Sequence, residues 1–324
     1  MVEQTGLVSA FLLDGRGGGL SCDWERIAAW APSDGLLWIH LNRDSDDAQT
    51  WLRERSGLDD LVVDAMLTEN TRPRCVPMDD GTMLFLRGVN LNPGADPEDM
   101  VSIRLWIEEN RIISIRLRRL LSVEDLRQAL AQGRGPVDAG DFVVRLAERL
   151  IARMAAVIGD VDDDVDRLQD QVLDARSAPL RTELTRLRRE IIALRRYLAP
   201  QRDALARLTQ SKLSWLGPAD ALHLREEADR VTRYVEDLDA ARERAAVTQE
   251  ELTNRLSEEM NSRMYVLSIV AAIFLPLGFL TGLLGINVGG IPLADNPSGF
   301  TEVAVILIGV TVLEILIFRW RRWL

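Results

Sequence analysis

The sequence predicts an α+β cytoplasmic domain with long helices, followed by two C-terminal transmembrane helices. Three observations predict this fold class. Short β-rich and helical segments alternate up to residue 119, long runs poor in Gly and Pro follow residue 136, and two apolar stretches end the chain. The first stretch, 264–284, carries no charge and at 1.5 Å per residue reaches roughly 30 Å, enough to cross a bilayer core.

The composition agrees with this division of the chain. The 324 residues are 47% hydrophobic and have a net charge of -11, which lies almost wholly before the apolar stretches. This charge argues against nucleic acid as a partner and favours the attraction of cations. Cys22 and Cys75 are far apart in sequence, so we expect free thiols in a reducing compartment.

Residues 1–135 form the predicted α/β cytoplasmic domain. Short β-rich stretches predict strands at 7–13, 36–41, 74–78, 82–89, 101–108 and 111–117. The last two flank Glu109-Asn110, which predicts a tight hairpin turn. Helical spacing is present at 24–30, 46–55 and 60–68. The mixture predicts a mixed or antiparallel sheet with helices.

Long helices follow. Residues 136–217 predict a helix hairpin, with runs at 141–175 and 180–212 separated near Pro179, a residue suited to a helix start. A third run from Pro218 to Pro276 has no breaker, which predicts about 65 residues of helix: a cytoplasmic stalk, 218–263, continuing into a first span, 264–285. Helices this long need partners, so we expect an oligomer.

The charges beside the spans predict their orientation. Arg263 precedes the first span, and the tail 319–324 contains Arg319, Arg321 and Arg322, whereas the loop 286–299 has no Lys or Arg. Basic ends stay in the cytoplasm, so both termini are expected to be cytoplasmic. The second span is predicted at residues 300–318. Trp320 and Trp323 suit the headgroup region. The N-terminus lacks the pattern of a signal peptide.

A stripe of polar and small residues at heptad spacing runs along the long helix. A coiled-coil seam would be apolar. If identical helices surround an axis, the stripe lines a partly wet path narrowed by Met264 and Leu275. The alternative is a small-residue packing face at Gly278, Gly282 and Gly285, with Pro276 as an ordinary kink. The stripe consists of Asn254, Ser257, Asn261, Met264, Ser268, Ala271, Leu275, Gly278 and Gly282.

The motif Gly285-Ile286-Asn287, just after a proline-containing first span, resembles the CorA superfamily of divalent-cation transporters. Ile286 departs from the Gly-Met-Asn typical of that family. The longer string GINVGGIP, from Gly285 to Pro292, looks like the bacterial ZntB branch, which is associated with zinc. The resemblance implies a funnel-shaped homopentamer in the bacterial inner membrane, with Asn287 meeting hydrated cations at the outer mouth. It also implies pore-facing positions at Asn261 and Met264, and proton coupling in the ZntB branch.

Three acidic residues near the membrane are further candidates. Asp295 is the only charge of the outer loop, where five copies would attract cations, although a solvated loop residue is the alternative. Glu302 suits the N-terminus of the second span. Glu314 is an intramembrane carboxylate that would carry a coupled proton, or would form an ion pair with Arg319.

Other charged patterns give weaker functional hypotheses. The run Asp160 to Asp166 fails as a calcium loop because Val165 and Gln171 stand where Gly and Glu are needed. It is expected to pair with the Arg-rich helix that follows, or to form a regulatory ion site. His40 and His223 are isolated, and no His/Cys spacing fits a zinc site, so the choice of metal rests on the resemblance.

The sequence is therefore interpreted as a homopentameric transporter of divalent cations, most of all zinc, and not as an enzyme. It is expected to lie in the lipid bilayer and to need no cofactor. No phosphate loop, nucleophile elbow or metal-hydrolase signature is present. One alternative is a channel for Mg²⁺, Co²⁺ or Ni²⁺ gated by intracellular metal. Another is a membrane-anchored sensor or scaffold that conducts nothing, whose function would survive Asn287→Ala.

Overall fold

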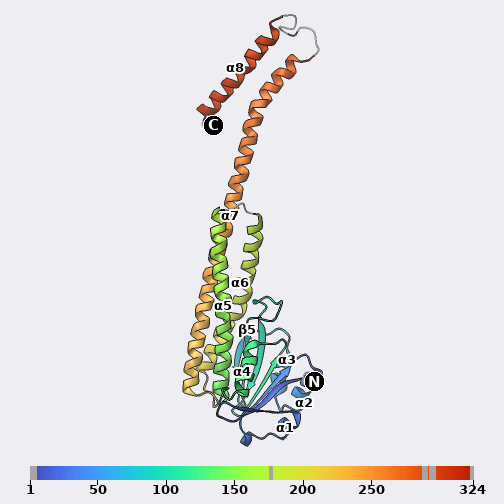
Figure 1. Cartoon of the computed structure of the whole chain (residues 1–324), viewed down its shortest axis with the longest axis vertical. Helices are drawn as coiled ribbons and strands as arrows, with labels where there is room; N and C mark the ends of the chain where they lie inside the picture. Colours follow the sequence, from blue (N-terminus) through green and yellow to red (C-terminus); the bar gives the residue numbers. More distant parts are fainter. Residues whose placement is uncertain (1–5, 175–177, 287–290, 292–296, 322–324) are drawn as a thin grey trace. The chain divides into compact units, whose positions relative to one another are not determined.

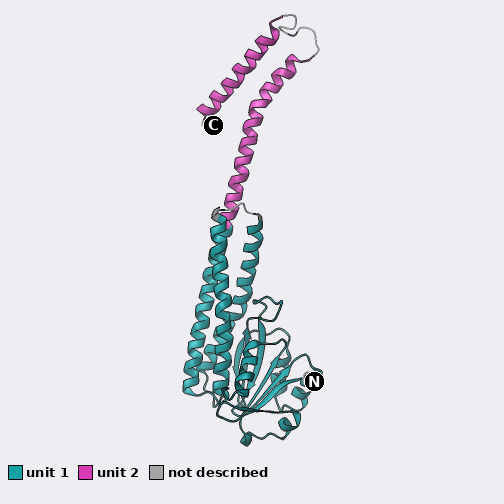
Figure 2. Ribbon diagram, in the orientation of Figure 1, with its two compact units in different colours: residues 1–249 teal, residues 250–324 magenta. Residues whose placement is uncertain are grey.

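The computed structural model describes residues 6–174, 178–286, 291 and 297–321. The chain forms two compact units, residues 1–249 and residues 250–324 (Figure 2). The first contains a sheet and long helices, and the second contains the apolar C-terminal segments (Figure 1). One helix, α7 (Pro218–Leu284), continues from the first unit into the second.

A seven-stranded mixed sheet is the centre of the first unit, in the order β2-β1-β3-β7-β6-β5-β4. All neighbours are antiparallel except β3 and β7, which are parallel. The predicted Glu109-Asn110 hairpin is confirmed, since the Glu108 N–H donates to the Arg111 carbonyl at 2.8 Å. The strands are β1 (Leu7–Leu13), β2 (Gly19–Ser21), β3 (Leu37–Asn42), β4 (Arg74–Pro77), β5 (Thr82–Gly88), β6 (Val101–Ile107) and β7 (Arg111–Arg116).

Helices cover both faces of the sheet. On one face α1 (Trp24–Ala29), α2 (Asp46–Glu54) and α3 (Asp60–Leu67) bury their apolar residues against Ile39 and Ile113. A 3-10 turn, Pro32–Asp34, follows α1. The other face receives α4 (Leu121–Ala131), α5 (Ala139–Asp174) and α6 (Ala178–Gln210) (Figure 1). Its aromatic centre is Trp38, whose ring lies 4.9 Å from that of Phe142 on α5.

The predicted strands and short helices are confirmed to within one or two residues at each end. Three elements of the described residues were not predicted: the strand β2, the helix α4 and the short 3-10 turn. The strand β2 has only three residues, too few for an alternating pattern. The helix α4 was missed although its buried Ser122, Leu126 and Leu130 repeat every four residues.

The long helices pack on one another and on the sheet. The part of α7 in the first unit buries residues at spacings of three or four, the pattern of a helix in a bundle. These residues are Leu224, Ala228, Val231, Val235, Leu238, Ala241 and Ala245. The α7 helix has 67 residues and passes Pro276 without ending, close to the predicted length of about 65.

Ion pairs join the acidic and basic stretches of these helices, as predicted. Arg186 on α6 pairs with Asp164 on α5 at 3.3 Å. The α7 helix supplies further partners, which the prediction did not include. Arg244 on α7 pairs with both Asp162 and Asp166 on α5. Asp239 on α7 accepts hydrogen bonds from Arg195 on α6. The acidic run is therefore occupied by structural pairing along much of its length.

The Arg195–Asp239 pair is the best placed of these to be measured. Arg195 Nε and Nη2 donate to the two carboxylate oxygens at 2.5 and 3.1 Å, in a bidentate arrangement. Both side chains are more than a third exposed, so water screens the pair. We expect a coupling energy of about 0.5–1 kcal/mol in a double-mutant cycle of Arg195→Ala and Asp239→Asn. A coupling of zero would show that solvent cancels the interaction.

A buried polar row crosses three strands of the sheet. Ser9 on β1 is opposite His40 on β3, and His40 is opposite Ser114 on β7. The Ser114 hydroxyl lies 2.8 Å from His40 Nδ1 and accepts from Trp38 Nε1 at 2.8 Å. His40 is fully buried, and burial together with nearby Arg116 and Arg127 lowers its pKa to about 3.

His40 makes stability depend on pH in a defined direction. Its pKa in the folded protein lies below the value of 6.5 in the unfolded chain, so only the unfolded chain takes up a proton between these values. Stability is full above pH 6.5 and is lost as the pH falls toward 3, by about 2 kcal/mol between pH 7 and pH 5.

Urea denaturation of the full chain in detergent at pH 7 and pH 5 measures this effect. We expect His40→Asn to lose most of the difference between the two pH values, whatever its absolute stability. The matched control is His223→Asn, because His223 is exposed. An unchanged pH difference in the His40 variant would contradict the assignment.

Candidate functional site

The second unit contains the membrane candidates. The C-terminal part of α7 and the helix α8 (Gly299–Trp320) are both long and apolar enough to span a membrane. The α8 helix extends the predicted 300–318 span by one residue at its start and two at its end. Glu302 lies in its first turn, where a carboxylate is stabilised by the helix dipole, as expected.

The predicted stripe is exposed at every position on α7. This holds from Asn254 and Ser257 through Asn261 and Met264 to Leu275 and the glycines Gly278 and Gly282. Within the single chain, a Cβ added at Gly278 or at Gly282 would meet no atom within 4 Å. Among the described residues, these glycines therefore serve no close packing.

The opposite side of the same helix segment is partly shielded. Ile269, Ile273 and Leu280 are less exposed than their neighbours, and their spacing places them on one face. Phe318 of α8 is buried and, with Tyr265, Ser268, Ile269 and Ala272, lines a small apolar pocket of about 240 Å³. Ser268 thus lies at the edge between the stripe and the α8 side.

Two serines of the stripe have a defined hydrogen-bond role. Ser257 Oγ donates to the Thr253 carbonyl at 2.9 Å, and Ser268 Oγ donates to the Met264 carbonyl at 2.8 Å. Because the protons point back to the helix, the lone pairs of these oxygens stay available outward. An oxygen of this kind accepts from a metal-bound water without replacing it.

The motif after the first span is described only in part. The α7 helix ends at Leu284, and the Gly285 N–H donates to the Thr281 carbonyl at 3.0 Å, which closes its last turn. Gly285 and Ile286 are exposed. Asn287 and Asp295, as well as Arg322 and Trp323, lie outside the described residues.

Glu314 of α8 has one carboxylate oxygen buried. Its Oε2 has no hydrogen-bond partner within the ranges that the structure describes. Among the described residues, this oxygen is therefore not paired with Arg319, the partner that the sequence offered as the alternative. Phe318, one turn further along the helix, is one of the five residues that line the small apolar pocket.

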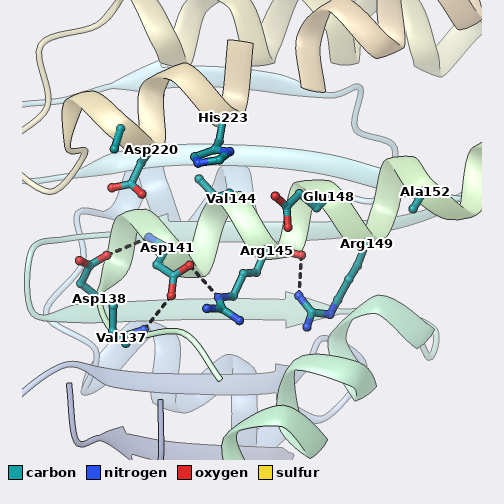
Figure 3. Close-up of a pocket in the computed structure, with 11 residues that line it drawn as sticks. Val137, Asp138, Asp141, Val144, Arg145, Glu148, Arg149, Ala152, Asp220 and His223 are labelled. Atoms are coloured by element: carbon teal, nitrogen blue, oxygen red, sulfur yellow. Dashed lines mark hydrogen bonds and ion pairs between the residues drawn. The ribbon is translucent and has the colours of Figure 1, made fainter. Parts of the chain in front are cut away.

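A polar groove of about 860 Å³ lies in the first unit between the first turns of α5 and α7 (Figure 3). Two of its carboxylates, Asp138 and Asp141, are engaged locally. Asp138 accepts from the Asp141 N–H at 2.8 Å, and Asp141 accepts from Arg145 at 2.7 Å (Figure 3). Burial, with Asp138 and Asp141 nearby, raises the pKa of Asp220. No group of three metal-ligating side chains occurs in the described part of the chain.

The arrangement of a long helix, an exposed polar stripe and two apolar spans matches a known family. A family model described as the CorA-like Mg²⁺ transporter protein matches residues 33–322. The chain belongs to the CorA-like transporter family. The resemblance carried by Gly285 and its two following residues is thereby confirmed, and so is the expectation of a transporter rather than an enzyme.

Individual relatives share the full length of this CorA-like chain. It is 44% identical to a divalent cation transporter, CmaX, from Pseudomonas aeruginosa, covering 99% of this chain and 98% of that protein. It is 37% identical to the zinc transport protein ZntB of Pectobacterium carotovorum, covering 95% and 93%. The structure of full-length CmaX matches with a TM-score of 0.86 at 43% identity, covering 99% of each chain.

Proposed function

We propose that this protein transports divalent cations, zinc above all, through a central pore formed by five copies of α7. The observation that carries the proposal is the continuous polar and small stripe, from Asn254 to Gly282, which is exposed in the single chain. In such a pore, five copies of each polar side chain would form a hydrated ring. Met264 and Leu275 would form the apolar constrictions between these rings. Such a stripe would have a function only in an assembly, where the stripes of neighbouring copies face one another.

The choice of zinc rests on the relatives. The ZntB relative is named for zinc transport, whereas CmaX, with higher identity, is named for divalent cations in general. A CorA-type channel for Mg²⁺, Co²⁺ or Ni²⁺ is the second candidate, favoured by the family description. A non-conducting scaffold is disfavoured because an anchor has no use for Asn and Ser at pore spacing.

The remaining roles follow from this arrangement. The first 263 residues would lie in the cytoplasm, with residues 264–285 and 300–318 in the bacterial inner membrane and the loop 286–299 outside. Asn287 would meet hydrated cations at the outer mouth, with Asp295 adding negative charge there. Glu314, with its unpartnered buried oxygen, is the candidate carrier of a coupled proton.

Flux into proteoliposomes tests the proposal. Zn²⁺, Mg²⁺ and Co²⁺ would be compared with and without a proton gradient, using the full chain, Asn287→Ala and Glu314→Gln. We expect gradient-enhanced Zn²⁺ flux that both variants impair. Mg²⁺ flux indifferent to the gradient would assign the protein to the channel candidate, and absence of flux for every metal would support the scaffold.

A further inference from the structure

The first apolar span has a hole of the coiled-coil type on its surface. Tyr265, Ser268, Ile269 and Ala272 follow one another at i, i+3, i+4 and i+7, the diamond of side chains that receives one knob in knobs-into-holes packing. Together with Phe318 of α8 they line the apolar pocket of about 240 Å³. A cavity of about 150 Å³ already holds a benzene molecule, so this hole has room for one aliphatic side chain.

The hole is open to a second helix. Its two small members, Ser268 and Ala272, are exposed in the single chain, and Tyr265 at its rim is 46% exposed. Phe318, at 9%, forms the floor. Small residues four positions apart let membrane helices approach closely. Because lipid is as apolar as a Leu side chain, the association of such helices depends on this fit of shapes.

The hole lies on one flank of the polar stripe, and Ser268 belongs to both. At this height the stripe consists of Met264, Ser268 and Ala271. With 3.6 residues per turn, the centre of the hole is about 80° around the helix from the centre of the stripe. When the stripes of several copies face one axis, the hole therefore faces a neighbouring copy.

Leu267 is the matching knob on the opposite flank. It lies about 70° from the centre of the stripe, on the side away from the hole. Its side chain is 69% exposed in the single chain. Along the helix axis it is less than about 3 Å from the centre of the hole, so copies at equal depth in the membrane bring the two together. A closed ring built from one repeated contact needs two complementary faces of this kind on each copy.

We propose that copies of this chain join head to tail in the membrane, with Leu267 of each copy seated in the hole of the next. The inference rests on the proposed pore, because it takes the stripe as the face toward the axis. It names the contact that closes the ring, which the stripe itself does not. It also gives α8 a part in the assembly, since Phe318 forms the floor of every hole.

Disulfide cross-linking of the full chain in membranes tests the contact. A chain with both Leu267→Cys and Ala272→Cys has one thiol on the knob and one in the hole, so oxidation with copper–phenanthroline should link each copy to both neighbours. We expect a ladder of covalent oligomers that ends at five copies. The matched control is Val266→Cys with Ala272→Cys, because Val266 has nearly the same depth and is 58% exposed but lies opposite the stripe. The native Cys22 and Cys75 are buried, so the original chain serves as the background.

The mass of the full chain in detergent separates the possible failures. An oligomeric mass without a ladder from the Leu267 pair would overturn this contact and leave the proposed pore standing. The mass of a single chain would overturn the proposed pore and this contact with it. Ladders from both pairs would show random collision and would also overturn the contact. A dimer from Leu267→Cys alone would show that like faces meet, which contradicts a head-to-tail ring.

An exchange of side-chain sizes is a second, independent test. Leu267→Ala removes the knob and Ala272→Leu fills the hole, so each alone should raise the protein concentration at which half of the assembly dissociates roughly tenfold. The double variant again sets a large residue against a small one and should return to within about threefold of the original chain. The control Val266→Ala should change this concentration by no more than about twofold. If Leu267→Ala assembled normally while Ala272→Leu only released bound phospholipid, an acyl chain would be the occupant of the hole and the proposal would be wrong.

Discussion

Replacing Gly282 by Leu is expected to lower cation flux about tenfold or more while the protein still folds and inserts. A side chain at this position has open space within the single chain, since a Cβ there meets nothing within 4 Å. In an assembly with the stripe at its axis, five Leu side chains would fill the path and expel its water. The measurement is Zn²⁺ uptake into proteoliposomes with matched amounts of protein.

The control for this variant is Gly309→Leu. Gly309 lies in α8, the second apolar helix, and it too has no atom within 4 Å of an added Cβ. Both variants therefore replace a glycine of an apolar helix by Leu. They differ in that Gly282 belongs to the stripe on α7 and Gly309 does not. We expect flux through Gly309→Leu to stay within about twofold of the original protein.

The mass of the assembly in detergent distinguishes the pore from a packing face. If the small residues only let membrane helices approach closely, Gly282→Leu would break the assembly. If they line a pore, the assembly would keep its mass while flux is lost. A variant with normal mass and normal flux would contradict both interpretations.

The membrane part of the molecule was predictable because its signals are local. An uncharged run such as 264–284 is read directly from composition, and the stripe is read from heptad spacing on a single helix. Each stripe position on α7 is exposed in the structure. Asn287, the residue that carried the resemblance, lies outside the described residues.

The cytoplasmic part was predictable as elements but not as a sheet. Each strand from β3 to β7 follows from its own pattern, but the parallel pairing of β3 with β7 joins residues more than 70 positions apart. No local pattern specifies such a pairing. The row of Ser9, His40 and Ser114 needs both that pairing and the antiparallel pairing of β1 with β3, so the sequence alone leaves His40 isolated.

Trp38→Ala is expected to destabilise the first unit by about 3–5 kcal/mol, the largest stability effect among the variants considered. Trp38 is fully buried, with ring centroids 6.0 Å from Phe11 and 4.9 Å from Phe142. Truncation leaves a cavity between the sheet and α5. It also removes the donor to Ser114 and so disturbs the hydrogen bonds of the buried row.

Two further variants divide this loss into its causes. Trp38→Phe keeps much of the packing but removes the indole N–H, so we expect a cost of about 1–2 kcal/mol. Leu61→Ala on α3 truncates a residue that is 68% exposed and should change stability by no more than about 0.5 kcal/mol. Urea unfolding of each full-length variant, followed by fluorescence, measures these values. If Trp38→Ala cost no more than Leu61→Ala, the face of the sheet under α5 would not be the core that the burial of Trp38 indicates. If Trp38→Phe cost as much as Trp38→Ala, the hydrogen bond to Ser114 rather than ring packing would hold that face together.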